Sequence, residues 1–290
     1  MPSPGHNLRT ALETAKPLVI PGVFNALVAK MAERAGFLAA YQSGAALSAN
    51  LAGLPDVGLL TQTEFAEQGR YLAQAVRVPI LSDADTGFGE PLSVERTVRL
   101  FESAGLAGLH LEDQEFPKRC GHLSGKTLIS QDAMVAKIRA AVSAKGDDDF
   151  LIIARTDARG VEGFKEAQQR ARAYAEAGAD LIFPEALETA DEFAKFAEGF
   201  PIPLIANMTE FGKSPLLTLD ELRALGYSAA IYPVTLLRVA MRAVDNALAT
   251  LLDEGGQASL LPRMQTRQEL YDLLDYTDFE ARDQAYFSAE

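Results

Sequence analysis

The sequence is poor in cysteine, in long apolar runs and in basic residues. Its 290 residues include one cysteine, Cys120, which excludes an internal disulfide and fits a reducing compartment. No apolar stretch approaches the roughly 18 to 20 residues that a membrane-spanning helix needs. The first ten residues, MPSPGHNLRT, hold no apolar segment of the kind found in export signals. We therefore expect a cytoplasmic protein.

The deficit of basic residues limits the partners of this protein. Lysine and arginine total 27 against 40 aspartates and glutamates, for a net charge of −13. Such a surface repels nucleic acid and anionic membranes, because both carry the same sign of charge. We expect a small-molecule substrate and neither of those partners. An anionic substrate would need a local arginine or metal cluster to hold it.

Short apolar runs alternate with stretches of helical spacing along the chain. Alternation of this kind predicts parallel βαβ units, and eight such units close into a (β/α)8 TIM-type barrel. No G-x-G-x-x-G follows the first run, which disfavours an open dinucleotide-binding sheet. Ser93, Ser130 and Thr218 are candidate helix N-caps, and Glu221 completes a capping box with Thr218. The eight runs are 18–21, 39–41, 79–81, 108–111, 150–154, 181–183, 203–206 and 229–232, and the clearest helical stretches are 95–104, 131–144, 165–177 and 220–225.

The C-terminal part of the chain falls outside the eight units. No linker precedes residue 255, so we expect a single barrel domain over residues 1–290. A long helical stretch at 235–254 ends at Gly255-Gly256, and a further helical segment is predicted at 266–276. We expect residues 256–290 to be a helical appendage that caps the barrel or packs on a neighbouring subunit.

Polar side chains follow the predicted strands at their C-terminal ends, where barrels of this class carry their active sites. Several carboxylates in one mouth repel one another unless a cation neutralises them. Oxygen ligands without a histidine or thiolate pair suit Mg²⁺, with Mn²⁺ as a second possibility. Asp83-Ala84-Asp85 is the most specific element, since strand alternation would aim both carboxylates at one ion; the alternative is that Asp85 only caps a turn. The polar tips are Tyr41, Ser43, Asp83, Asp85, His110, Glu112, Asp113, Arg155, Asp157, Glu185, Asn207 and Thr209.

The segment Lys118-Arg119-Cys120-Gly121-His122 follows the fourth strand. A thiol beside lysine, arginine and histidine lies in positive potential, which favours the thiolate. Gly121 and Gly125 give freedom to the loop, so we interpret residues 116–126 as a lid. The alternative is a surface loop with an incidental cysteine.

Three arginines have open assignments. Arg155 follows an apolar strand and is either a carboxylate clamp or the partner of Glu185 in a structural ion pair. Arg238 and Arg267 could equally lie on helix surfaces. His6 and His110 receive no role beyond packing.

The motifs around these residues resemble the isocitrate lyase/phosphoenolpyruvate mutase superfamily over nearly the whole chain. Lys-Arg-Cys-Gly-His is typical of its lyase branch and is lost in the mutase and decarboxylase branches. One segment departs from the family, since Ala45-Ala46 stands where its lyases usually carry glycines, and the added methyls could narrow the pocket. The matching segments are 41–44 (YQSG), 53–56 (GLPD), 83–89 (DADTGFG), 108–114 (GLHLEDQ), 118–122 (KRCGH), 154–157 (ARTD), 183–186 (FPEA), 207–212 (NMTEFG) and 264–267 (MQTR).

The resemblance implies roles for individual residues. Asp83 and Asp85 would hold Mg²⁺, with Asp56 and Glu112 in the surrounding shell. Cys120 and Gly121 would close over the substrate. The family also implies a homotetramer in which the terminal helix swaps between subunits. The implied substrate-binding residues are Ser43, Gly44, Ala45, Gly121, Arg155, Glu185, Asn207, Thr209, Arg238 and Arg267, and the implied catalytic residues are Cys120, Tyr41, Lys118 and His122.

The activity implied is a magnesium-dependent carbon–carbon lyase that splits 2-methylisocitrate into pyruvate and succinate by retro-aldol chemistry, in propanoate catabolism. The hydroxyl base would be Tyr41 or a carboxylate near the metal, and Cys120 would supply the proton. A 2,3-dimethylmalate lyase or an oxaloacetate decarboxylase on the same scaffold is the nearest alternative; Cys120 argues against the decarboxylase and against a phosphonate mutase. A non-catalytic barrel that binds a carboxylate is a hypothesis of another class.

Overall fold

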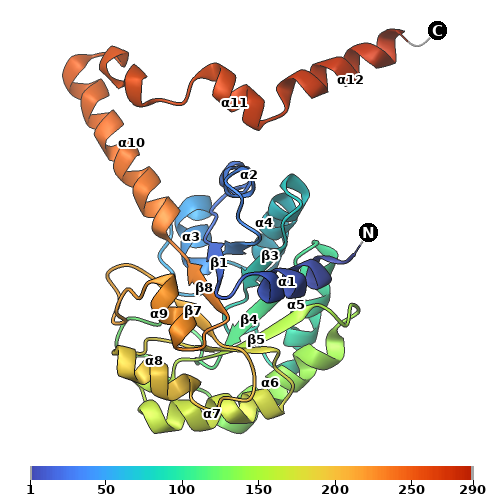
Figure 1. Ribbon diagram of the computed structural model, residues 1–290, viewed down its shortest axis with the longest axis vertical. Helices are drawn as coiled ribbons and strands as arrows, with labels where there is room; N and C mark the ends of the chain where they lie inside the picture. The colour runs from blue at the N-terminus through green and yellow to red at the C-terminus, as the bar shows by residue number, and fades with distance from the viewer. Residues whose placement is uncertain (1, 289–290) are drawn as a thin grey trace. The chain divides into compact units, whose positions relative to one another are not determined.

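The computed structural model describes residues 2–288. Within that range the chain forms eight strands that alternate with helices, as Figure 1 shows. Each strand lies within two residues of a run expected from the sequence, because a short apolar segment between helices can bury its side chains and pair its backbone groups as a strand of a sheet. The strands are β1 (Leu18–Pro21), β2 (Ala40–Gln42), β3 (Ile80–Asp83), β4 (Gly108–Glu112), β5 (Leu151–Thr156), β6 (Leu181–Pro184), β7 (Ile205–Asn207) and β8 (Ala229–Tyr232).

All strand pairs are parallel, and their order closes a barrel. Hydrogen bonds join β2 through β6 in chain order and join β7, β8 and β1 in a second group. Single parallel bridges, Gly22 to Tyr41 and Ile182 to Leu204, connect the two groups on either side. The (β/α)8 barrel expected from the sequence is therefore confirmed.

Helices surround the strands: α5 packs on β4, α6 on β5, and α7 on β5 and β6, and Figure 1 shows α6 and α7 outside β4 and β5. Ser130 and Thr218 cap α6 and α9 as expected, the latter with Glu221 in a capping box. Ser93 is not an N-cap: α5 begins earlier, after Glu90, because Pro91 has the fixed φ that suits the first helical position. The helices are α2 (Ala26–Arg34), α3 (Gly44–Leu47), α4 (Gln62–Ala75), α5 (Pro91–Ser103), α6 (Gln131–Ala144), α7 (Phe164–Glu176), α8 (Ala190–Ala197) and α9 (Leu219–Ala224), with short turns η1 (Ser48–Ala52) and η2 (Ala158–Gly160).

The buried apolar residues form two cores, one inside the barrel and one between the strands and the surrounding helices. The inner cluster includes Leu18 and Ile153 from the strands together with Leu8 and Ala11 of α1 (Pro4–Thr14). Gly5 packs against the backbone of residues 149–150, directly before β5. Helix α1, which the sequence analysis did not predict, thus closes the N-terminal end of the barrel, opposite the polar strand tips.

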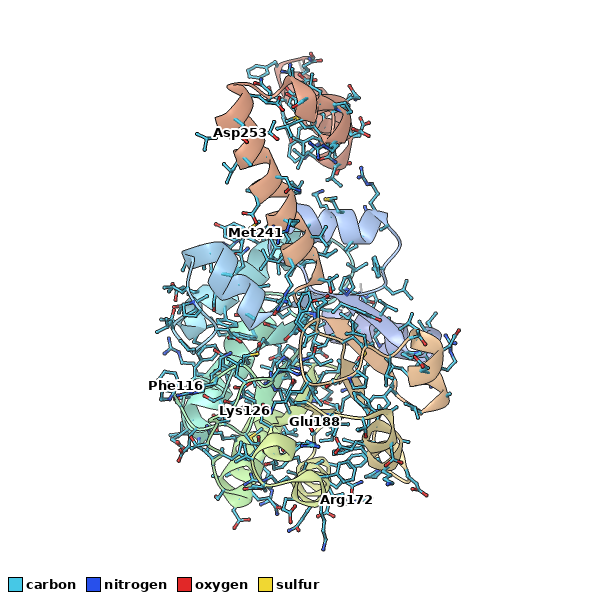
Figure 2. The ribbon with its side chains drawn as sticks, turned by 90° about the vertical axis from the view of Figure 1, so that its left-hand side faces the viewer. Phe116, Lys126, Arg172, Glu188, Met241 and Asp253 are labelled. Carbon is cyan, nitrogen blue, oxygen red and sulfur yellow. The ribbon has the colours of Figure 1, made fainter. Side chains whose placement is uncertain are left out.

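Contacts within the chain divide it into two compact units, residues 1–237 and 238–290. The second holds most of α10 (Thr235–Glu254), η3 (Ala258–Arg263), α11 (Arg267–Leu273) and α12 (Tyr276–Ser288), and Figure 2 labels Met241 and Asp253 on α10. The helix expected at 266–276 corresponds to α11, which ends at Leu273, and Asp275 adopts a left-handed φ of 56° before α12 begins. No helix in the described range combines the length and the apolar character needed to span a membrane. The appendage at 256–290 stays a prediction.

Candidate active site

The polar strand tips come together at the C-terminal mouth of the barrel. Asp83 ends β3, Glu112 ends β4 and Asn207 ends β7. Arg155 lies in β5 and Glu185 directly follows β6. Because every strand is parallel, these side chains meet on one face of the barrel although 124 positions (207 − 83) separate the first from the last.

Arg155 is the electrostatic centre of the mouth. Its Nε donates to Asp157 Oδ2 at 3.0 Å and lies 3.6 Å from Glu185 Oε2. Its Nη1 lies 3.2 Å from Glu112 Oε2. Burial acts to lower the pKa of Arg155, but Asp157, Glu112 and Glu185 raise it well above its usual value. The ion pair with Glu185 is thus present, and Asp157 is the partner that makes the hydrogen bonds.

Asp83 and Asp85 are positioned by a turn and not by strand alternation. The strand ends at Asp83, and Asp85 has a left-handed φ of 44°. The Asp85 N–H donates to Asp83 Oδ1 at 2.9 Å, and the Gly44 N–H donates to Asp83 Oδ2 at 3.1 Å. A side chain at Gly44 would come within 2.7 Å of Asp83 Oδ2. The two carboxylates do share one wall, but the reason that the sequence suggested for it was wrong.

Burial disfavours the charged form of two carboxylates of this wall, Asp85 and Glu112. Burial raises the pKa of Asp85 to about 7, although Lys118 opposes the shift. Burial also raises the pKa of Glu112 well above its usual value, against Arg155 and Lys118. Neither oxygen of Glu112 accepts a hydrogen bond among residues 2–288, although Arg155 Nη1 lies 3.2 Å from its Oε2. A nearby cation would stabilise the ionised form of these buried carboxylates.

Lys118 of the lid supplies positive charge at this wall. Its side chain is 2% exposed, and its Nζ contacts Asp56 and lies 2.8 Å from Asp85 Oδ1. Within residues 2–288, no three histidine, cysteine, aspartate or glutamate side chains form a ready-made metal site. The residues nevertheless fit a hard divalent cation, since they are oxygen donors with an unsatisfied, buried glutamate and an excess of negative charge.

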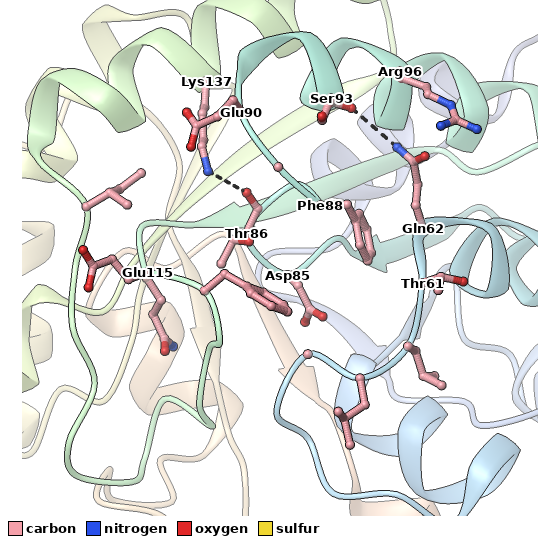
Figure 3. Close-up of a pocket in the computed structure, with 17 residues that line it drawn as sticks. Thr61, Gln62, Asp85, Thr86, Phe88, Glu90, Ser93, Arg96, Glu115 and Lys137 are labelled. Atoms are coloured by element: carbon pink, nitrogen blue, oxygen red, sulfur yellow. Dashed lines mark hydrogen bonds between the residues drawn. The ribbon is translucent and has the colours of Figure 1, made fainter.

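Asp85 also borders a cavity of about 760 Å³ beside the mouth, shown in Figure 3. Phe88 and the lid root at Phe116 line it, and Lys137 donates to the Thr86 carbonyl at 3.1 Å along its edge. The other wall residues of the mouth do not line this cavity. It is a neighbour of the site and not its centre.

Tyr41 and His110 form a buried pair under the mouth. The Tyr41 hydroxyl lies 2.8 Å from His110 Nε2. Burial lowers the pKa of His110 to about 4, despite Asp83 nearby, so the imidazole is neutral at pH 7. Burial and then Asp83 raise the pKa of Tyr41 well above its usual value. The sequence analysis assigned His110 no role beyond packing. Its position between Leu109 and Leu111, on the inward-facing side of β4, could have indicated that it lies under the mouth.

The lid lies directly on Arg155 and Glu185. A Cβ atom at Gly121 would be 2.5 Å from Arg155 Nη2 and would also overlap Glu185. The Leu123 N–H donates to the Cys120 carbonyl at 2.9 Å, which makes residues 120–123 a tight turn. The tip of the lid therefore approaches the mouth as closely as a backbone can, and only glycine fits there.

His122 fixes the lid tip through both ring nitrogens. The Lys213 N–H donates to His122 Nδ1 at 2.9 Å, so Nδ1 is an acceptor without a proton. His122 Nε2, 2.6 Å from Glu185 Oε1, must then carry the hydrogen. The same Nε2 lies 3.5 Å from Asn207 Nδ2. His122 thus joins the lid to the loop after β7 and to Glu185.

The Cys120 thiol is held in its neutral form. Burial and the nearby Glu185 raise its pKa, and a hydrogen bond from the His122 backbone and Arg155 only partly oppose them. The thiolate that its basic neighbours suggested is therefore not favoured. Lys118 pairs with carboxylates, so little of its charge is free to act on the sulfur. A half-buried protonated thiol is suited to give a proton.

The remaining sequence-predicted residues are less constrained. The Ser43 side chain accepts from the Ala46 N–H and caps α3, and half-buried Ala45 lies on that helix. Thr209 is half-buried in the loop after β7. Arg238 and Arg267 belong to the second unit, so their roles stay predictions.

The phosphoenolpyruvate phosphomutase family model matches residues 8–252. The chain belongs to the phosphoenolpyruvate mutase/isocitrate lyase superfamily. A curated relative, "2-methylisocitrate lyase" of Aeropyrum pernix, is 52% identical over 280 residues, covering 97% of this chain and 90% of the relative.

Solved structures of the superfamily agree in fold. A crystal structure of 2,3-dimethylmalate lyase superposes with a TM-score of 0.91 at 35% identity, covering 98% of this chain and 96% of that one. A phosphonopyruvate hydrolase in complex with oxalate and Mg²⁺ gives a TM-score of 0.89 at 32% identity, covering 99% and 100%. Family membership thus rests on sequence and on structure.

Proposed function

We propose that this protein is a magnesium-dependent 2-methylisocitrate lyase that splits its substrate into pyruvate and succinate, in propanoate catabolism. One observation carries the proposal: a lid with a protonated, half-buried thiol at Cys120 lies on the Arg155–Glu185 pair. The high identity to a relative named for this activity supports it.

Asp83, Asp85, Asp56 and Glu112 would hold the magnesium ion, because they are the oxygen donors of one wall. When bound, the ion would polarise the hydroxyl and carboxylate of the substrate. Its positive charge would also relieve the raised pKa values of Asp85 and Glu112. The magnesium present in the related phosphonopyruvate hydrolase complex supports the choice of metal.

Substrate carboxylates would be bound by Arg155 and by amide and hydroxyl donors of the mouth, namely Ser43, Gly44, Ala45, Gly121, Asn207 and Thr209. Glu185 would keep Arg155 and His122 in place. Arg238 and Arg267 would take the distal carboxylates. Arg155 is suited to this role because its planar guanidinium can bind a carboxylate through two parallel hydrogen bonds.

Cleavage would start with loss of the proton from the substrate hydroxyl. Tyr41, whose pKa is raised, is a better donor of a hydrogen bond than a base, which favours a wall carboxylate as the base. The C–C bond electrons would pass to the succinate carbon, held as its aci-carboxylate and stabilised by Arg155. The Cys120 thiol would then protonate that carbon, and Lys118 and His122 would hold the lid shut against water.

A 2,3-dimethylmalate lyase is the second candidate. Ala46 is fully buried in α3 beside Gly44, so the two alanine methyls take space at one wall of the mouth and would favour a smaller substrate. The similarity in fold to a lyase of that name supports this alternative.

We also propose a homotetramer in which the terminal helix swaps between subunits. Leu252, Phe279 and Phe287 are 86%, 61% and 85% exposed in the second unit, and exposed apolar side chains on helices are typical of surfaces that pack on another subunit.

A pyruvate-release assay tests the activity. The purified protein is offered 2-methylisocitrate, isocitrate, 2,3-dimethylmalate and oxaloacetate in turn. We expect 2-methylisocitrate to give the highest kcat/KM, and EDTA to abolish turnover until Mg²⁺ is restored. Preference for dimethylmalate would select the second candidate, and turnover insensitive to EDTA would exclude the proposed metal dependence.

A further inference from the structure

Lys126 is a buried cation at the C-terminal end of the lid, and nothing in the proposed chemistry uses it. Its side chain is 2% exposed. Its Nζ donates to Asp157 Oδ1 at 2.9 Å and also to the carbonyl of Gly121, five residues back along the lid. Burying a lysine is costly unless it is paired, so this arrangement has a structural or functional reason.

The two acceptors of Lys126 belong to different parts of the molecule. Gly121 is in the lid tip, next to Cys120. Asp157 lies at the end of β5, where its backbone N–H donates to Asp113 Oδ1 at 2.9 Å. The Lys126 ammonium therefore ties the lid to the residue that follows β5.

Asp157 also holds Arg155. Arg155 Nε donates to Asp157 Oδ2 at 3.0 Å, and Arg155 Nη2 donates to Asp157 Oδ1 at 3.2 Å. The second oxygen is the one that Lys126 binds. A single carboxylate thus contacts both the proposed substrate-binding arginine and the cation that grips the lid.

We propose that Lys126 is a positioning residue that latches the lid shut, and that it couples lid closure to the alignment of Arg155 through Asp157. With the latch closed, the carbonyl of Gly121 is fixed and the Cys120 thiol is held over the mouth. The expected effect of Lys126 on turnover rests on the proposed function, whereas its expected effect on the lid does not.

The test uses Cys120 as a reporter, since it is the single cysteine of the chain. Alkylation by iodoacetamide is timed for the unsubstituted protein and for Lys126→Met. We expect alkylation to be at least tenfold faster in the variant, the change that corresponds to losing about 1.5 to 3 kcal/mol of hydrogen bonding to a charged group. Removing a nearby cation by itself would slow the reaction, because it disfavours the thiolate. Acceleration therefore reports an opened lid.

Two further variants separate positioning from general damage. Lys137→Met removes another buried lysine, which bonds the Thr86 carbonyl and lies outside the lid; its alkylation rate should stay within about twofold of the original protein. Lys126→Arg keeps the charge and should restore most of the protection. In the pyruvate assay, Lys126→Met should lower kcat at least tenfold and also raise KM, because both the Cys120 thiol and Arg155 lose their alignment.

Unchanged alkylation in a folded Lys126→Met protein would overturn the proposal, as would equal acceleration in Lys137→Met. If Lys126→Met does not fold, Lys126→Gln takes its place with the same thresholds, since its neutral and shorter side chain also loses the charge-assisted bonds to Gly121 and Asp157. Absence of lyase activity in the original protein would refute the proposed function and leave the alkylation result to stand.

Discussion

The two ends of the barrel, built from the same eight strands, bury different kinds of side chain. At the N-terminal end, Leu8 and Ala11 of α1 close an apolar interior. At the C-terminal end the buried groups are charged, among them Glu112, Arg155 and Glu185. Apolar burial stabilises the fold, whereas buried charges cost free energy unless they are paired. We therefore expect substitutions at the first end to affect stability and substitutions at the second end to affect the proposed chemistry.

The largest expected effect concerns chemistry alone. Replacing Cys120 with alanine should lower kcat by about a thousandfold, within the range of general acid catalysis, because no other group in the lid tip carries a protonated thiol. The unfolding midpoint should stay within a few degrees, since the thiol contributes little packing. Steady-state pyruvate release and thermal unfolding measure the two. Full turnover in Cys120→Ala would remove the cysteine from the mechanism.

The opposite end should give the opposite pattern. Leu8 is 1% exposed against the inner core, so Leu8→Ala should lower the free energy of unfolding by about 2 to 4 kcal/mol through lost burial and a cavity. The mouth does not contact Leu8, so kcat below the unfolding transition should be unchanged. Urea titration gives the stability. A large loss of kcat with intact stability would show that the two ends are not separable.

The smallest expected effect is a dependence of stability on pH. Burial raises the pKa of Glu185, but Arg155 and His122 outweigh it and leave the pKa far below the usual value. As the pH falls, Glu185 therefore stays ionised in the folded protein, whereas in the unfolded chain it takes up a proton. The stabilisation that Glu185 gives to the folded state is present above about pH 4.5 and is lost below it, at about 1.4 kcal/mol per pH unit.

Glu185→Gln provides the control for that dependence. Urea unfolding at pH 5.5, 4.5 and 3.5 should show a shallower loss of stability in the variant than in the original protein. Identical slopes would mean that Glu185 is not held ionised by its partners.

Much of the fold could be predicted from the sequence. The eight strands and α6 (Gln131–Ala144) follow from local patterns, because a buried strand must be apolar and an amphipathic helix has a fixed period. Helix α1 was missed, since its sequence carries a proline, a glycine and few apolar residues, and its place is decided by packing under the barrel. The break between α11 and α12 is likewise set by the left-handed backbone conformation of Asp275, which the residue pattern does not predict.

Which residues gather at the mouth could also be predicted, because parallel strands bring their ends together. The pairing within it could not. Lys118 beside Asp56, and Lys126 beside Asp157, join positions 62 and 31 residues apart, and only the folded lid brings them into contact. The pKa of Cys120 was misjudged for the same reason, since burial and Glu185 outweigh the charges adjacent to it in the chain.

The direct test of proton delivery from the closed lid is to run the reaction on 2-methylisocitrate in D₂O and to analyse the succinate. If a thiol held on one side of the carbon gives the proton, each succinate will carry one deuterium in a single configuration. Deuterium distributed equally between the two configurations would mean that bulk water protonates the carbanion, and it would contradict the role assigned to the lid.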